Sequence, residues 1–301
     1  MLYFLQQVMN GLHSGALYAL LAFGYALTNG VLKRTNLAYG AVFAFCGQTA
    51  ILVAVFGWYV LFLTLPATIA LGTAAALLYA VLVSEVLSRK VFAPLAKSSP
   101  NTIVTATLGV SIVLMELVRI GADTKDFWLP PMLAAPVVFA AADGFRVTLT
   151  VIQLVNCALI ASLIGVAALL LQRSSYGRQW RAVCDDSAAA ELCGVDADRV
   201  FRGAVLGGSM AAAVAGILAA LYFGNISFGT GLIFGLKVLF VTAVGGYRSP
   251  LQAAGGAMIF GIAEALWSGY FAIEWRDAAM FAGLVTLLVL RPNERDETER
   301  A

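Results

Sequence analysis

Long runs without a charged residue decide what this chain can fold into. No Asp, Glu, Lys or Arg occurs between Thr35 and Ser84, and a second such run extends from Val147 to Leu171. A helix of about 20 apolar residues is long enough to cross the hydrocarbon core of a bilayer. Because 61% of the 301 residues are hydrophobic and only 12% are charged, the chain is too apolar for a soluble domain of this size. We therefore expect an all-α, polytopic membrane protein.

The apolar runs predict eight or nine transmembrane helices. They cover residues 5–27, two spans between 35 and 84 that separate at 57–59, and then 102–120, 147–171, 204–223, 232–244, 251–270 and 277–290. No charged or Ser- and Pro-rich linker divides the chain, so residues 1–301 are expected to form a single transmembrane domain. Arg89 and Lys90, which Pro94 and Pro100 follow, predict a polar, non-helical loop.

Basic residues predict the orientation of these helices. Most Lys and Arg residues of the loops lie on the same side as residues 173–202, and few lie on the opposite side. By the positive-inside rule, residues 173–202 and the short polar tail 291–301 are cytoplasmic, and the N-terminus is outside. Prolines interrupt residues 121–146, which are therefore expected to form a periplasmic excursion, with a short hairpin strand at 137–139.

Residues 173–202, which we call the polar segment, form the longest polar stretch between predicted spans. Arginines and acidic residues are concentrated in it: Arg173, Arg178, Arg181, Arg199 and Arg202, with Asp185, Asp186, Glu191, Asp196 and Asp198. Asp186 and Ser187 can cap a short helix over the alanines that follow, and Gly194 suits the left-handed residue that ends it. A short helix in water between two spans is well shaped for docking to a partner.

At these residues the sequence resembles the cytoplasmic coupling loop of ABC-importer permeases, in the form used by the branched-chain amino acid permease family. The matching residues are Gly177-Arg178, Arg181-Ala182-Val183, Asp185-Asp186, Ala189-Ala190 and Gly194-Val195. The resemblance extends to Asn10-Gly11-Leu12, Gly15–Leu20, Gly235-Leu236-Lys237, Gly245-Gly246 and Arg291-Pro292. Tyr39 stands where the family usually has a histidine, which leaves the identity of the substrate open.

The resemblance implies the membrane-spanning permease subunit of an ATP-driven importer for branched-chain or related hydrophobic amino acids, in the bacterial inner membrane. It implies a second, related permease subunit, two ATP-binding subunits and a periplasmic substrate-binding protein as partners. ATP would be bound and hydrolysed on the partner subunits, so this chain would bind no cofactor and would not itself be an enzyme. No metal site is expected, because the four cysteines show no paired metal spacing. The ATPase-coupling residues would be Gly177, Arg178, Arg181, Asp185, Asp186, Ala189, Ala190, Glu191 and Gly194.

Two alternatives remain open at the level of sequence. The same machinery would serve urea, short amides or other small organic acids. A secondary transporter driven by an ion gradient would need an intramembrane carboxylate that titrates, and Glu264 is the best candidate. An intramembrane enzyme is disfavoured because the sequence has no nucleophile and base in a recognisable arrangement, and no Walker motif for ATP.

Two short segments with the same pattern, Asn-x-x-aromatic-Gly, occur at 36–40 and 225–229. They follow the first and the sixth predicted spans and enter the membrane from opposite faces, as inverted repeats do in transporters. In transporters, glycine-interrupted helices expose backbone groups near the middle of the membrane, where a substrate can bind them. Simple helix packing is the alternative explanation for the repeated pattern. The candidate residues of a substrate path are Asn36, Tyr39, Gly40, Asn225, Ser227 and Gly229.

Ionisable residues also lie within the predicted spans. A charge at the centre of a bilayer costs about 3 kcal/mol or more, so each of them needs a partner. Glu116 and Arg119 are one helical turn apart and are expected to pair. Lys237 and Glu264 lie in adjacent predicted spans, and we expect a structural ion pair between them; a role in substrate binding is the alternative.

Overall fold

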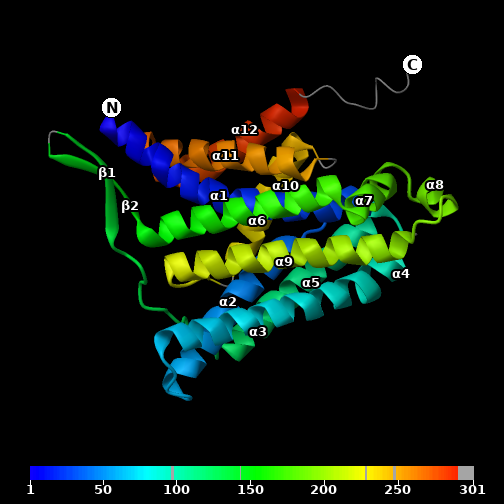
Figure 1. Cartoon of the computed structure of the whole chain (residues 1–301), viewed down its shortest axis with the longest axis horizontal. Coiled ribbons are helices and arrows are strands. Elements are labelled where there is room, and N and C mark those ends of the chain that lie inside the picture. Colours follow the sequence, from blue (N-terminus) through cyan, green and yellow to red (C-terminus); the bar gives the residue numbers. More distant parts are fainter. Residues whose placement is uncertain (96–97, 143, 228, 247–248, 291–301) are drawn as a thin grey trace.

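The computed structural model describes residues 1–290 except 96–97, 143, 228 and 247–248; the predicted polar tail 291–301 lies outside the described residues. The protein is a bundle of long helices with one β-hairpin at one end (Figure 1). The long helices are α1 (Leu2–Leu32), α2 (Ala38–Tyr59), α3 (Leu65–Val86), α5 (Pro100–Gly121), α6 (Val151–Arg173), α9 (Ala197–Phe223), α10 (Thr230–Gly245), α11 (Pro250–Tyr270) and α12 (Arg276–Leu290). Shorter elements connect them: a π-helical turn η1 (Leu87–Phe92), α4 (Ala93–Leu95), β1 (Pro136–Ala142), β2 (Phe145–Thr150), α7 (Ser175–Asp185), α8 (Ser187–Leu192) and a 3₁₀ turn η2 (Ile273–Trp275).

Six of the helices within the described residues are long and apolar enough to cross a membrane: α1, α2, α3 with its continuation to Leu95, α5, α6 and α9. A seventh crossing is possible if the bent pair α10 and α11 counts as one broken span or a re-entrant loop. The all-helical, polytopic class is thus supported, whereas the predicted eight or nine spans are not reached by this criterion. The predicted spans that are missing lie at the end of the chain, where α10 has 16 residues and α12 has 15. Both helices are shorter than the roughly 20 residues that cross a bilayer.

Helix α1 lies in the core of the bundle. In its most apolar stretch 89% of the residues are buried inside the protein, against 17% in α6, which faces outward. Glycines bring its neighbours close: Gly15 packs directly on Met258 and Gly261 of α11, and Gly24 packs on Gly208 of α9. Without a hydrophobic driving force between helices in lipid, such close backbone contact is a main source of helix association.

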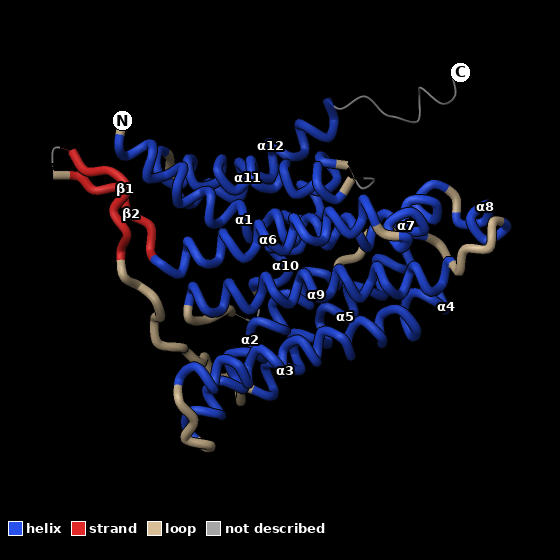
Figure 2. The backbone as a smooth tube through the Cα atoms, viewed as in Figure 1, coloured by secondary structure: helices blue, strands red, loops and turns tan. Residues whose placement is uncertain are grey.

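The connection between α5 and α6 forms the hairpin end of the molecule (Figure 2). Strands β1 and β2 pair antiparallel, so the hairpin strand expected at residues 137–139 is confirmed. Residues 147–150 belong to β2 and not to the membrane helix that the sequence predicted from Val147. Helix α6 begins at Val151 because Thr150 and Gln153 form a capping box that satisfies its first N–H groups.

The prediction of a polar, non-helical loop around Arg89 and Lys90 is wrong, because α3 continues through η1 into α4. Arg89 forms an ion pair with Glu85 one turn earlier, so its charge is compensated on the helix itself. Leu87 and Phe92 of this stretch are buried, and their packing against the bundle favours a helix over a loop.

Candidate functional site

The middle of the polar segment folds into two short helices at the end of the bundle opposite the hairpin (Figure 1), and its last residues begin α9. The predicted helix is present as α8: the Asp186 carboxylate accepts hydrogen bonds from the N–H groups of Ala188 (2.9 Å) and Ala189 (3.3 Å). Gly194 has a positive φ of 83°, as its predicted role at the helix end requires. Helix α7 was not predicted; the Ser174 hydroxyl caps it by accepting a hydrogen bond from the N–H of Gly177 at 3.1 Å.

Trp180 anchors α7 to the membrane bundle. Its side chain is 2% exposed, and its indole N–H donates to the carbonyl of Leu27 in α1 at 3.0 Å. Trp180, Val183 and Ala190 form a small separate core with Leu27 of α1 and Val200 of α9. A tryptophan inside a polar segment is the sequence signal that indicates such an anchor.

Further contacts fix the first part of the polar segment. Gly177 packs so closely on Leu171 that a Cβ at this position would clash with the Leu171 backbone. Arg181 donates to the carbonyl of Leu171 at 2.6 Å, and Lys33 donates to the carbonyl of Asp185 at 3.1 Å. The Tyr176 hydroxyl donates to Val200 at 3.2 Å, and burial raises the pKa of this tyrosine to about 12.

Helix α8 presents a different, open surface. Ala189, Glu191 and Leu192 are exposed on it, and Leu192 is 91% exposed although it is apolar. The predicted coupling residues therefore divide into two groups. Gly177 and Ala190 are buried and hold the segment on the bundle, whereas Arg178, Arg181, Asp185, Asp186, Ala189, Glu191 and Gly194 are exposed. Leu192 was not among the predicted residues.

The first glycine-interrupted segment is packed in the core. Asn36 accepts a hydrogen bond from the N–H of Ala38 at 3.0 Å, which turns the chain into α2, and Tyr39 is 3% exposed. A Cβ at Gly40 would clash with the carbonyl of Gly231 and would lie 2.5 Å from Cα of Gly235, both in α10. The first segment therefore meets the helix that follows the second segment.

The second segment is more open. Ser227 and Gly229 are exposed, and Asn225 lines a small pocket together with Gln48 of α2. Gln48 donates to the carbonyl of Ile226 at 2.7 Å and also lines a second pocket between α2, α5 and α10. Gln48 thus ties α2 to the second segment, and no sequence pattern singled it out.

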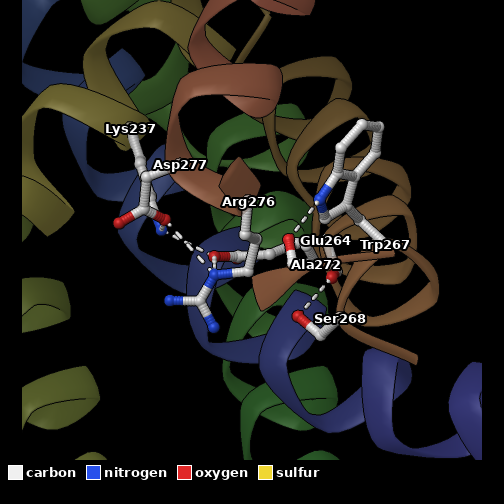
Figure 3. Close-up of polar contacts among 7 residues, drawn as sticks. All are labelled: Lys237, Glu264, Trp267, Ser268, Ala272, Arg276 and Asp277. Carbon is white, nitrogen blue, oxygen red and sulfur yellow. Dashed lines mark hydrogen bonds and ion pairs between the residues drawn. The ribbon is translucent and has the colours of Figure 1, made fainter. Parts of the chain in front are cut away.

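A cluster of four charged residues lies between α10, α11 and the start of α12 (Figure 3). We call Lys237, Glu264, Arg276 and Asp277 the charged cluster. The Lys237 ammonium lies 2.6 Å from Glu264 Oε1 and 2.9 Å from Asp277 Oδ1. Arg276 Nε lies 3.3 Å from Asp277 Oδ1 and 3.4 Å from Glu264 Oε1. The expected neighbours Lys237 and Glu264 are therefore in contact, within a larger cluster that the sequence did not predict.

The four side chains differ in how far they reach the surface. Lys237 and Glu264 are buried, with side chains 2% and 8% exposed, whereas Arg276 and Asp277 are 34% and 43% exposed. Glu264 Oε2 is buried and has no hydrogen-bond partner among the described residues. The turn that leads into α12 is fixed by Trp267, whose indole N–H donates to the carbonyl of Ala272 at 3.3 Å.

Known permease proteins resemble this chain over almost its whole length. Residues 7–290 match the model of the family described as branched-chain amino acid transport system / permease component. The chain belongs to this family. It is 30% identical to the high-affinity branched-chain amino acid transport system permease protein LivH of Escherichia coli (strain K12), over 97% of this chain and 94% of that protein.

Other relatives are similarly distant. The chain is 29% identical to LivH of Salmonella typhimurium, over 97% of this chain and 94% of the relative. It is 27% identical to the permease protein BraD of Pseudomonas aeruginosa, over 96% and 94% of the two chains. No solved structure matches the chain. The resemblance on which the sequence analysis relied is therefore confirmed at the level of the family.

Proposed function

We propose that this chain is the membrane-spanning permease subunit of an ATP-driven importer that translocates branched-chain or related hydrophobic amino acids. Membership of the family and the full-length similarity to LivH and BraD support this proposal. The chain itself binds no cofactor in this proposal, and ATP is hydrolysed on two partner subunits. A second permease subunit and a periplasmic substrate-binding protein complete the transporter.

The observation that carries the ATP-driven mechanism is the construction of the polar segment. One part of it is fixed to α1 through Trp180, and the other part exposes Leu192 on α8, away from the bundle. An apolar side chain that is 91% exposed on a polar segment gains free energy when a partner covers it. We infer that α8 docks in a groove of an ATP-binding subunit and that α7 transmits movement of this subunit to α1.

Orientation and location follow from the same proposal. The polar segment and the C-terminus lie in the cytoplasm of a bacterium, and the N-terminus and the hairpin lie in the periplasm, as the distribution of basic residues favours. The hairpin end then faces the substrate-binding protein. If α10, α11 and α12 each enter the bilayer separately, the eight or nine predicted spans are retained.

A substrate path beside the two glycine-interrupted segments is consistent with the proposal. Its residues would be Asn36, Tyr39, Gly40, Asn225, Ser227 and Gly229, with Gln48 at the point where the two pockets meet. Tyr39 and Gly40 are packed in this conformation, so the path would open only when α2 and α10 separate at Gly40. Transporters move such elements between discrete states.

The docking proposal is tested by Leu192→Asp in the complete transporter, reconstituted with its partners in liposomes. We expect ATP hydrolysis to lose its stimulation by the loaded binding protein and ATP-driven leucine uptake to fall at least about tenfold, because a charge replaces the apolar contact. Gln179→Glu is the matched control, since this exposed residue of α7 also gains a negative charge. Unchanged uptake in Leu192→Asp would contradict docking through α8, and uptake driven by an ion gradient without ATP would contradict the importer.

A further inference from the structure

An apolar groove adjoins the charged cluster. It lies between α10, α11 and α12 and includes Val241, Phe260 and Met280. Each of these residues is one helical turn from a residue of the charged cluster on the same helix, and it lies on the same face of that helix. The charged cluster therefore stands at one end of the groove, and the walls of the groove are apolar.

The charged cluster has unused binding capacity of both signs. Arg276 uses only its Nε in the ion pairs described above, and Figure 3 shows the two terminal nitrogens of its guanidinium pointing away from the other charged residues. The carboxylate of Asp277 is 43% exposed, and both of its ion pairs described above use Oδ1, so Oδ2 stays available to a ligand. A ligand can thus reach a donor pair on Arg276 and a carboxylate acceptor on Asp277.

The charge balance restricts the class of ligand. Two cations and two carboxylates compensate one another in the charged cluster. A ligand with a net charge would leave an excess charge in a region of low dielectric, which is costly. A zwitterion adds one charge of each sign and keeps the balance. A ligand that also fills the groove needs an apolar body beside its charged end.

We propose that the charged cluster and the groove form a subsite for an amino acid with an apolar side chain. The α-carboxylate binds the terminal nitrogens of Arg276, the α-ammonium binds Asp277, and the side chain lies against Phe260 and Met280. The buried side chains of Lys237 and Glu264 hold Asp277 and Arg276 in place through the ion pairs described above. This inference rests on the proposed function, and it favours apolar amino acids over urea and short amides, which have no body to fill the groove.

The test uses protection of an introduced cysteine in the purified permease in nanodiscs. Ala279→Cys places a thiol in the groove one turn from Arg276, and Ala278→Cys places one beside it on the exposed face of α12 as the matched control. N-ethylmaleimide labelling of each position is followed by mass spectrometry, which separates it from the native cysteines. At leucine concentrations about ten times the dissociation constant, labelling at position 279 should slow about tenfold, while position 278 should not respond.

Two analogues and one further variant test the recognition of both charges. Leucinol lacks the carboxylate and 4-methylpentanoate lacks the amine, so neither should protect position 279. Arg276→Gln should remove protection by leucine without unfolding the protein, because Arg276 is partly exposed and Lys237 keeps both of its carboxylate partners. The melting temperature of this variant verifies its fold, and Arg276→Lys should recover part of the protection.

Several outcomes would overturn the subsite. The first is labelling at position 279 that leucine does not slow at concentrations up to about 10 mM, which is ten times a dissociation constant of about 1 mM. The second is protection by leucinol or by 4-methylpentanoate that equals the protection by leucine. A third is protection without leucine in nanodiscs that contain phosphatidylethanolamine and not in those of phosphatidylcholine alone, since the occupant is then a lipid headgroup. ATP-driven leucine uptake by the reconstituted transporter keeps the two proposals apart. Uptake without protection overturns only the subsite, and protection without ATP-driven uptake overturns only the importer.

Discussion

At the scale of single residues, Lys237 is a charged side chain that is fully buried among the described residues. Its ammonium group is buried among apolar helices and is compensated by Glu264 and Asp277 together. The aromatic ring of Tyr18, with its centroid 6.0 Å away, adds a favourable contact from α1. The pair of Glu116 and Arg119 has the same chemistry, at 2.6 Å, but its side chains are 36% and 50% exposed. Because solvent screens the exposed pair, the two pairs should differ in their contribution to stability.

This difference is measurable in a double-mutant cycle. Lys237→Met and Glu264→Gln should each lower the free energy of unfolding by up to about 3 kcal/mol, because each leaves a buried group without its partner. The double variant should recover part of the loss. Glu116→Gln should cost less than about 1 kcal/mol, as for an exposed pair. Thermal or denaturant unfolding in detergent provides the values, and additive losses for Lys237 and Glu264 would show that the two are not coupled.

At the scale of elements, the polar segment combines a fixed helix with an exposed one. Helix α7 is held by the Trp180 side chain and by the close contact between Gly177 and Leu171. Helix α8 contributes one buried residue, Ala190, to the small core around Trp180. In the docking proposed above, a force applied to α8 is carried into α1 and α9 through Trp180 and its neighbours.

Graded substitutions at Trp180 test this connection. Trp180→Phe removes the hydrogen bond to Leu27 and should cost about 1 kcal/mol, whereas Trp180→Ala also leaves a cavity and should cost about 3 kcal/mol or more. Amide hydrogen exchange should become faster in α7 and α8 in the same order, with α10 and α11 unchanged as the internal control. Equal protection of α7 in all three proteins would show that Trp180 does not anchor it.

At the scale of the whole molecule, the hairpin and the polar segment lie at opposite ends of the bundle (Figure 1). Cys193, next to the exposed end of α8, is itself exposed, whereas Cys46 and Cys184 are buried. Asp123, at the hairpin end, is exposed as well. The hydrogen bond from Lys125 holds the pKa of its carboxyl below the usual range, and the two side chains form an exposed ion pair.

The orientation can be determined with a membrane-impermeant maleimide. Cys193 should be labelled in inverted membrane vesicles and not in intact spheroplasts, because the proposed orientation places α8 in the cytoplasm. Asp123→Cys should show the opposite behaviour at the hairpin end. Labelling of Cys193 in spheroplasts whose membrane excludes the reagent would invert the proposed orientation.

The sequence by itself determined the features that depend on neighbouring residues. Runs without charge located the membrane helices from α1 to α9, and Asp186 with Gly194 located α8, because caps and helix ends are formed by residues close together in the chain. The tertiary structure alone decided the rest. Arg276 and Asp277 join Lys237, Trp180 binds Leu27, and Gly40 meets α10, because each contact depends on how separate helices pack. No local pattern encodes the distance between helices, so residue spacing predicted the pair of Lys237 and Glu264 but not the addition of Arg276 and Asp277 or the groove beside them.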